Sequence, residues 1–180
     1  PGVLMAGADP AIIAQIAYRS MPVDEFTEGS GFEAPAEDSE TPAIDVLEQL
    51  RATLTEQLSA QGITLPDDAF TGPEAVEIAG KPGARLRLLA PATTLENGQP
   101  FPGIDMAIIL VELPEDQVAA IQYTYQGAPE ASVYAEFEAW LAENAERATE
   151  PLVIDDAPVE EAPIQDAPAD ATATPEAEDE

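Results

Sequence analysis

The chain contains no histidine and no cysteine, and it has only 6 lysine and arginine residues among 180. Without imidazole or thiol groups it cannot form a His- or Cys-based catalytic triad, a thiol redox centre, a zinc finger or a disulfide. Catalysis could rest only on carboxylates, hydroxyls and phenols, with few cations to polarise a substrate. We therefore expect no catalytic residues, no cofactor and no metal site, and hence a protein that is not an enzyme.

Positive charge is scarce relative to negative charge. Aspartate and glutamate number 36, which leaves a formal net charge of −30. Nucleic acids and anionic membrane surfaces are bound by stripes of lysine and arginine that so few bases cannot supply. We expect neither among the partners of this chain, which leaves cations, basic proteins and largely neutral protein surfaces.

Long hydrophobic runs are missing as well. No apolar stretch reaches the roughly 18 residues that a membrane-spanning helix needs. The chain begins at Pro1 and not at methionine, so we expect a targeting segment to be missing and the protein to be extracytoplasmic or associated with the cell envelope. A high-salt environment would also account for the acidity.

The composition divides the chain into a domain and a tail. Residues 1–149 contain all 6 bases, and we expect them to form a single α+β domain. Residues 150–180 contain 11 acids, no base and three acid-Ala-Pro pentads, which predicts a disordered, solubilising acidic tail. Within the domain, the acidic Pro/Gly-rich stretch 23–41 predicts a long loop tacked down by Phe26 and Phe32, or a lid over a ligand.

Two helices are predicted from the spacing of apolar residues. Thr41 followed by Pro42 is typical of a helix start. The helix Ile44–Gln61 that follows has one apolar stripe, formed by Ile44, Leu47, Leu50, Leu54 and Leu58. Near the other end of the domain, Ser132 is the predicted N-cap of a second helix, whose inward face is Val133, Phe137, Trp140 and Leu141.

Strands are predicted before and between the two helices. Val3–Ala6 and Ala11–Arg19 predict two strands at the N-terminus. Alternating apolar residues predict a hairpin over Glu74–Ala90 with its turn at residues 80–83. A second hairpin is predicted from the strands Ile104–Leu113 and Gln117–Tyr125, and it spans Ile104–Tyr125.

Two details of the second hairpin carry further expectations. Pro114, Glu115 and Asp116 suit a type I turn. The continuous apolar run 108–111 favours a central strand that is covered on both faces. The expected fold is therefore α+β: a mostly antiparallel β-sheet with two amphipathic helices packed on it, in the order β-β-α-β-β-β-β-α.

The helix Ile44–Gln61, the two hairpins and a closing aromatic helix over Tyr134–Ala145 together span most of residues 1–147. In this order they resemble the PsbP-like, DcrB-like family of α/β/α sandwiches. The aromatic, Pro-containing first strand segment of that family is not visible here. The resemblance implies an accessory, assembly or stabilising role toward another protein.

No motif points to a particular reaction. Ser30 lies outside the Gly-x-Ser-x-Gly pattern, and residues 80–83 lack the spacing of a phosphate-binding loop. Carboxylates are too numerous for sequence alone to single out an acid–base pair. Two alternatives to a binding module stay open: a carboxylate-based enzyme with its site under the 23–41 loop, and a calcium-binding domain. The loop-located calcium candidates are Asp9, Asp67, Asp68 and Asp105.

A cluster of bases and a pair of tyrosines mark a possible binding surface. Lys81, Arg85 and Arg87 are half of all the bases, and on a strand the two arginines share one face. They either pair with neighbouring carboxylates or contact an anion or acidic peptide. Tyr123 and Tyr125 also share a face, and they either cover the sheet or line a shallow surface. The expected function is a non-enzymatic module that binds or supports another protein.

Overall fold

The computed structural model describes residues 2–6, 13–36, 39–95, 98–127 and 132–152. The large sheet consists of the strands β1 (Gly2–Ala6), β2 (Ile13–Pro22), β3 (Phe70–Ile78), β4 (Lys81–Ala90), β7 (Ile104–Leu113) and β8 (Gln117–Gln126). Two short strands, β5 (Thr93–Thr94) and β6 (Pro100–Phe101), form a separate ribbon. The helices are α1 (Val23–Ser30), α2 (Pro42–Ala60) and α3 (Tyr134–Ala148).

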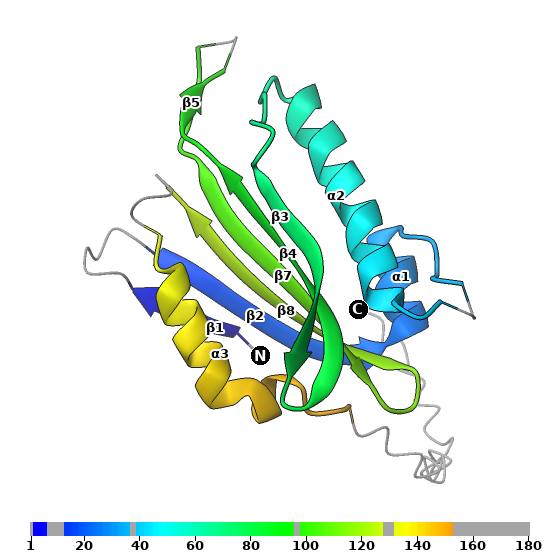
Figure 1. The fold of residues 1–180 in the computed structure, drawn as a ribbon. Helices are drawn as coiled ribbons and strands as arrows, with labels where there is room; N and C mark the ends of the chain where they lie inside the picture. The colour runs from blue at the N-terminus through cyan, green and yellow to red at the C-terminus, as the bar shows by residue number, and fades with distance from the viewer. Residues whose placement is uncertain (1, 7–12, 37–38, 96–97, 128–131, 153–180) are drawn as a thin grey trace, which may run out of the picture.

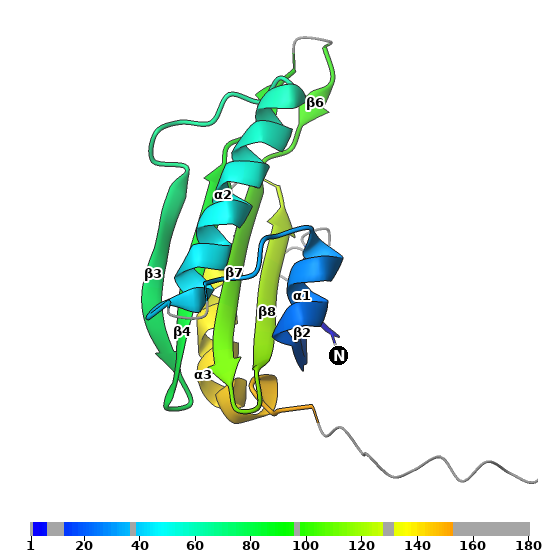
Figure 2. The same ribbon diagram turned by 90° about the vertical axis from the view of Figure 1, so that its right-hand side faces the viewer.

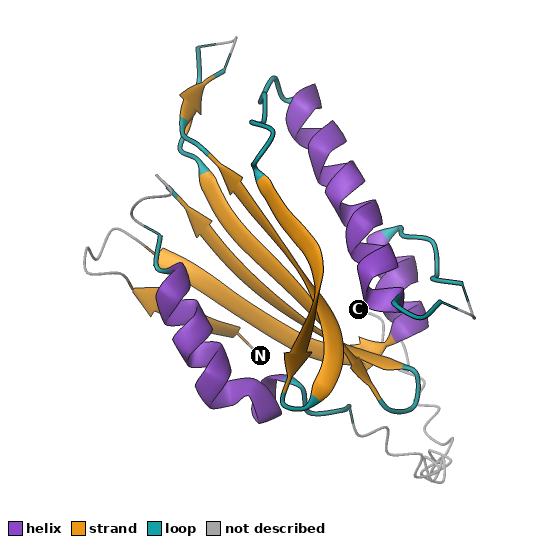
Figure 3. Ribbon diagram, viewed as in Figure 1, coloured by secondary structure: helices purple, strands orange, loops and turns teal. Residues whose placement is uncertain are grey.

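The six strands of the large sheet lie in the order β1-β2-β8-β7-β4-β3, and every pairing is antiparallel. Figures 1 and 2 show α1 and α2 on one side of this sheet and α3 on the other. Figure 3 shows that the strands form one continuous layer between the helices. The α+β class is therefore confirmed, with the expected element order extended by α1 and the β5–β6 ribbon.

Strand β7 lies inside the sheet, between β8 and β4. Its residues Ile109, Leu110 and Val111 are all buried, and successive residues of a strand face opposite sides of the sheet. The strand is therefore covered on both faces, which confirms the prediction from its continuous apolar run.

The predicted loop over residues 23–41 is wrong for its first eight residues, because residues 23–30 form α1. Val23 and Phe26 pack on the sheet side of α1, and Thr27 is buried with its hydroxyl bonded to the carbonyl oxygens of Val23 and Asp24. Gly31 ends the helix in the left-handed conformation, with φ of 72°. The acidic, glycine-containing composition of this segment is typical of a loop, but Val23, Phe26 and Thr27 are spaced by three and four residues, as on one face of a helix.

Both hairpin turns differ from the prediction. Between β3 and β4 the chain turns at Ala79 and Gly80, whose φ angles are 52° and 72°, so Lys81 already belongs to β4. This is the left-handed geometry that tight hairpins require. Between β7 and β8, Glu115 and Asp116 also have positive φ, 60° and 53°, which excludes the predicted type I turn.

Helix α2 begins at Pro42 directly after Thr41, as predicted, and it buries Leu47 against the sheet. Helix α3 buries Phe137 and Leu141 as predicted, whereas Trp140 is only partly buried and packs against Tyr18 with ring centroids 5.6 Å apart. The predicted Ser132 cap is wrong, since Val133 occupies the N-cap and no side chain caps the helix.

The core has two unlike layers. Between the sheet and α3 it is aromatic, because Tyr123 stacks on Phe137 at 5.1 Å between ring centroids and meets Tyr134 edge-on at 5.5 Å. Between the sheet and α1 and α2 it is mainly aliphatic, with Leu47 and Leu110 buried there. Each core layer is thus formed by the apolar face of the sheet and the apolar face of the helix or helices that pack on it.

After α3 the chain docks on the strand ends. Thr149 is fully buried, the Ser20 hydroxyl donates to the carbonyl oxygen of Glu150 at 2.5 Å, and the Gln117 side chain pairs with both backbone groups of Leu152. The first residues of the predicted tail 150–180 are therefore held, and residues 153–180 lie outside the described residues. None of the helices in the described ranges is long and apolar enough to cross a membrane.

Candidate interaction groove

Helix α3 covers only part of its face of the sheet. Strands lie about 4.8 Å apart, so six strands span roughly 24 Å, whereas a helix with side chains is about 10 Å wide. On the opposite face α1 packs on β2 and β8, and α2 packs on β3, β4 and β7. Helix α3 packs mainly on β2 and β8, which leaves the α3-side surface of β3 and β4 without a helix among the described elements.

A groove of about 670 Å³ lies along this uncovered strip, between α3 and β3–β4, and we call it the α3–β3 groove. Its floor is formed by Val76, Ile78, Ile109 and Leu141. Val76 and Ile78 are only partly buried although they pack against the core under α3. Apolar side chains are therefore accessible at the bottom of an open groove.

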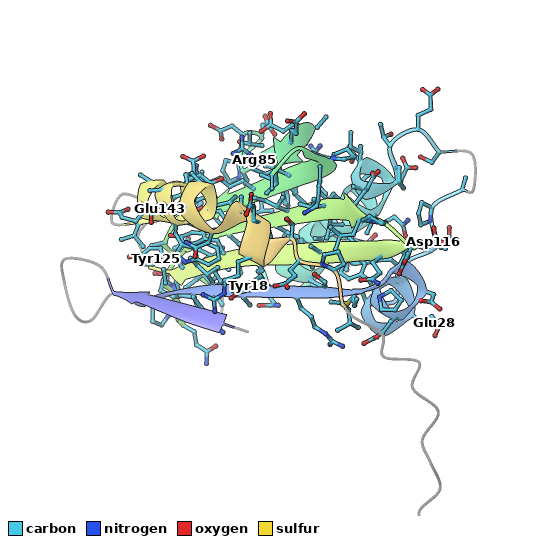
Figure 4. All side chains as sticks on the ribbon, turned by 90° about the horizontal axis from the view of Figure 1, so that it is seen from below. Tyr18, Glu28, Arg85, Asp116, Tyr125 and Glu143 are labelled. Atoms are coloured by element: carbon cyan, nitrogen blue, oxygen red, sulfur yellow. The ribbon has the colours of Figure 1, made fainter. Side chains whose placement is uncertain are left out.

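The rim of the groove is acidic. Glu77, Glu138, Glu143 and Glu146 are exposed there, against a single base, Arg85. Arg85 from β4 and Glu143 from α3, both labelled in Figure 4, come from the two elements that border the groove. Carboxylates therefore outnumber bases by four to one around the apolar floor.

Arg85 binds carboxylates on both sides of itself. Its guanidinium lies 2.6 Å from Glu74 on β3 and 3.3 Å from Glu138 on α3. The hydrogen bonds that Arg85 donates to Glu74 are the main reason why the pKa of Arg85 is raised above its ordinary value. Arg85 therefore links β3, β4 and α3, and it has little capacity left for an anion.

Arg87 lies two residues further along β4 and binds a buried carboxylate. Its Nε and Nη2 atoms donate to the two oxygens of Asp105 at 2.9 and 2.8 Å, and Asp105 is fully buried. The guanidinium also lies 3.6 Å from the centre of the Tyr134 ring. Burial works against the charged form, but the hydrogen bonds and charge of Asp105 outweigh it and raise the pKa of Arg87.

Two hydroxyl groups complete this buried cluster. The Ser132 hydroxyl donates to Oδ2 of Asp105, and the Tyr123 hydroxyl lies 2.9 Å from the Ser132 oxygen. Burial raises the pKa of Tyr123 and that of Tyr134. Arg87, Asp105, Ser132 and Tyr123 are hydrogen-bonded to one another, so the cluster joins β4, β7 and β8 to the segment before α3.

The structure separates the five residues of the predicted binding surface. Lys81 donates to the backbone and side-chain oxygens of Thr149, at 3.0 and 2.9 Å, while Arg85 and Arg87 share the α3 face as predicted. Tyr123 and Tyr125 are only 0% and 2% exposed and belong to the core cluster under α3, so they cover the sheet and line no surface. The three bases bind within the chain, which matches the carboxylate-pairing interpretation for the two arginines.

The groove itself was not among the predicted sites. A signal was present, however: six predicted strands with only two helices implies that one face of the sheet is incompletely covered. Glu138 and its neighbours on α3 then mark the side of the helix that faces the uncovered strip.

The structure also bears on the two alternative sites, an enzyme site under residues 23–41 and a calcium site. The cavity beneath residues 23–41 holds only about 50 Å³, and among its mainly apolar lining Glu112 is the one carboxylate. In the part of the chain that the structure describes, no group of three or more potential ligands could hold a metal ion. Asp105 is on a strand and paired with Arg87, which corrects its expected loop position, and Asp9 lies outside the described residues.

Comparison with known proteins gives no relative: no family model, no curated protein and no solved structure matches the chain. Its function must be inferred from its own residues.

Proposed function

We propose that the chain is a non-enzymatic protein-binding module, and that the α3–β3 groove receives a segment of its partner. The observation that carries this proposal is the open apolar floor formed by Val76, Ile78 and their neighbours. Val76 and Ile78 are partly exposed there, and apolar side chains left in contact with water cost free energy that a partner covering them would recover.

The arrangement of carboxylates supports a binding role over catalysis. General acid–base chemistry uses a carboxyl group whose pKa is shifted by an apolar pocket. The fully buried carboxylate of Asp105 is instead neutralised by Arg87 and bonded to Ser132. The glutamates around the groove are exposed, which suits them to contact a partner.

The proposal extends to an accessory role outside the cytoplasm. The element order resembles the PsbP-like, DcrB-like sandwiches, whose members assist other proteins, and the acidic Ala/Pro-rich residues 150–180 have the composition of a solubilising spacer. Fold-level resemblance is an association only, so the groove carries the argument.

Site-specific photo-crosslinking in the cells that make the protein tests the proposal. A photoreactive amino acid replaces Ala142, which is exposed in the groove, or Ala52, which is exposed on α2 on the other side of the sheet. We expect a discrete adduct from position 142 and none from position 52. Equal labelling from both positions, or no adduct from position 142, would show that the groove is not a binding site.

A further inference from the structure

The side of α3 that borders the groove is suited to a second helix. Glu138, Leu141, Ala142 and Ala145 line the groove and follow at steps of three, one and three residues, so they form one stripe along α3. The two alanines are small and let another helix approach closely. From Glu138 to Glu146 the stripe extends for roughly 12 Å at 1.5 Å per residue, slightly more than two turns of helix.

The uncovered strip of the sheet has the width that a helix needs. Packed helices lie about 8–10 Å apart, which is close to the spacing of two strands. Because α3 packs mainly on β2 and β8, a helix placed beside it at this distance lies over β7 and β4. Its apolar stripe would then contact Ile109 on β7 and, at its far edge, Val76 and Ile78 on β3. The helix would occupy on this face the position that a second helix occupies on the opposite face.

The charge around the groove identifies the occupant. Glu143 and Glu146 flank the floor on the α3 side, and Glu77 flanks it at the end of β3. A helix with lysine or arginine on both sides of its apolar stripe would place positive charge opposite both edges. The chain's own tail carries 11 acids and no base over residues 150–180, and a second copy has a net charge of −30, so both would be repelled.

We propose that the α3–β3 groove binds a basic amphipathic helix of two to three turns from a partner protein, lying beside α3 over β7 and β4, with β3 at its far edge. This inference rests on the proposed function and adds the form and charge of the partner segment. Apolar contacts supply affinity, while the glutamates set orientation and accelerate association.

Three synthetic peptides of identical composition test the inference. Each has about 14 residues of leucine, lysine and alanine, enough for three turns and their ends. In the first the leucines follow helical spacing, in the second they alternate as in a strand, and in the third they are scattered. Dissociation constants for the full chain are measured by fluorescence anisotropy at about 0.15 M salt, where distant charges are screened.

We expect the helically spaced peptide to bind at least about tenfold more tightly than the other two, the difference that well-placed apolar contacts supply. The double variant Glu143→Lys/Glu146→Lys should weaken this binding by about tenfold or more, because it reverses the rim charge. The matched control Glu48→Lys/Glu56→Lys makes the same change of net charge on exposed positions of α2, and it should leave the affinity nearly unchanged.

Any of the following results would overturn the inference. Equal binding of the three peptides, or equal weakening by the two double variants, would mean that only the overall charge attracts them. Preference for the alternating peptide would mean that the partner segment is a strand. If none of the peptides binds while the adduct at Ala142 still forms, the helix inference fails and the binding function stands; if that adduct is also absent, both fail.

Discussion

Two arginines on one strand have different roles, although the sequence presents them as a pair. Arg85 lies among exposed glutamates, whereas Arg87 is held against the fully buried Asp105. Their shared face was predictable from the alternation of the strand. The partner of Arg87 was not, because it depends on the register that pairs Arg87 with Ala107 and thereby puts Asp105 on the same face of the neighbouring strand.

We expect Arg87→Met to lower the free energy of unfolding by about 3–5 kcal/mol, since it leaves the buried charge of Asp105 without its counter-ion. Arg85→Met, two residues away on the same face, should cost only about 0–1 kcal/mol because its ion pairs are exposed to water. Urea denaturation followed by the fluorescence of Trp140 measures both. Equal losses would contradict the structural role assigned to the buried pair.

The two buried phenols predict a loss of stability in alkali. Burial raises the folded-state pKa of Tyr123 and Tyr134, while an unfolded tyrosine titrates near pH 10. The folded state therefore favours the neutral phenols, and their contribution is intact below about pH 10 and is lost as the pH rises through the folded-state pKa values.

Tyr134→Phe keeps the ring under Arg87 and removes one ionisable phenol. We expect this variant to lose less stability than the parent between about pH 9 and pH 11, measured by urea denaturation at each pH. An identical loss in the two proteins would show that the Tyr134 phenol does not contribute to the alkaline transition.

At the scale of elements, the spacing of apolar residues correctly predicted the core strands and helices. Residue composition gave wrong predictions for helix α1 and for the start of α3. The strand Ile104–Leu113 was predicted with its observed bounds, and α2 starts at the predicted Pro42. Helix α1 was missed because its glutamates and glycine resemble a loop. Ser132 was read as a cap because serine is a common N-cap, yet its hydroxyl binds Asp105, a partner distant in sequence.

The docked segment 149–152 predicts how truncations behave. A chain ending at Ala148 loses the hydrogen bonds to Lys81, Ser20 and Gln117, and we expect it to be less stable by roughly 2–5 kcal/mol at about 1 kcal/mol per bond. A chain ending at Leu152 keeps them, and its stability should equal that of the full chain.

Thermal and urea denaturation of the three chains distinguishes these expectations. A clear loss of stability in the chain ending at Leu152 would mean that residues beyond it also contribute to the fold.

At the scale of the whole molecule, the net charge can be read directly from the sequence, whereas the order of the strands in the sheet cannot. Residues 1–149 contain 25 acids and 6 bases. Such a chain repels itself, and this follows from composition alone. The position of the groove depends on which strands each helix covers. Local sequence patterns do not encode this, because it depends on the strand order, in which β2 lies next to β8 from the other end of the domain.

We expect salt to stabilise the protein, because at about 0.1 M it shortens the screening length to about 10 Å. Calcium and magnesium compared at constant ionic strength should raise the thermal midpoint equally and without saturation. Micromolar, calcium-selective stabilisation would instead indicate a specific site and favour the calcium-binding alternative.

The pairing of β2 with β8 has a consequence for biosynthesis. Ala14 pairs with Tyr125, so the long pairing of β2 with β8 joins segments made at very different times. At about 5–20 residues per second, β2 leaves the ribosome roughly 5–20 seconds before its neighbour is synthesised. During that interval its apolar residues Ile16 and Tyr18, buried in the finished sheet, have no permanent cover. We therefore expect these residues of the nascent chain to stay exposed until β8 is synthesised, with the negative charge of the chain limiting aggregation in that interval.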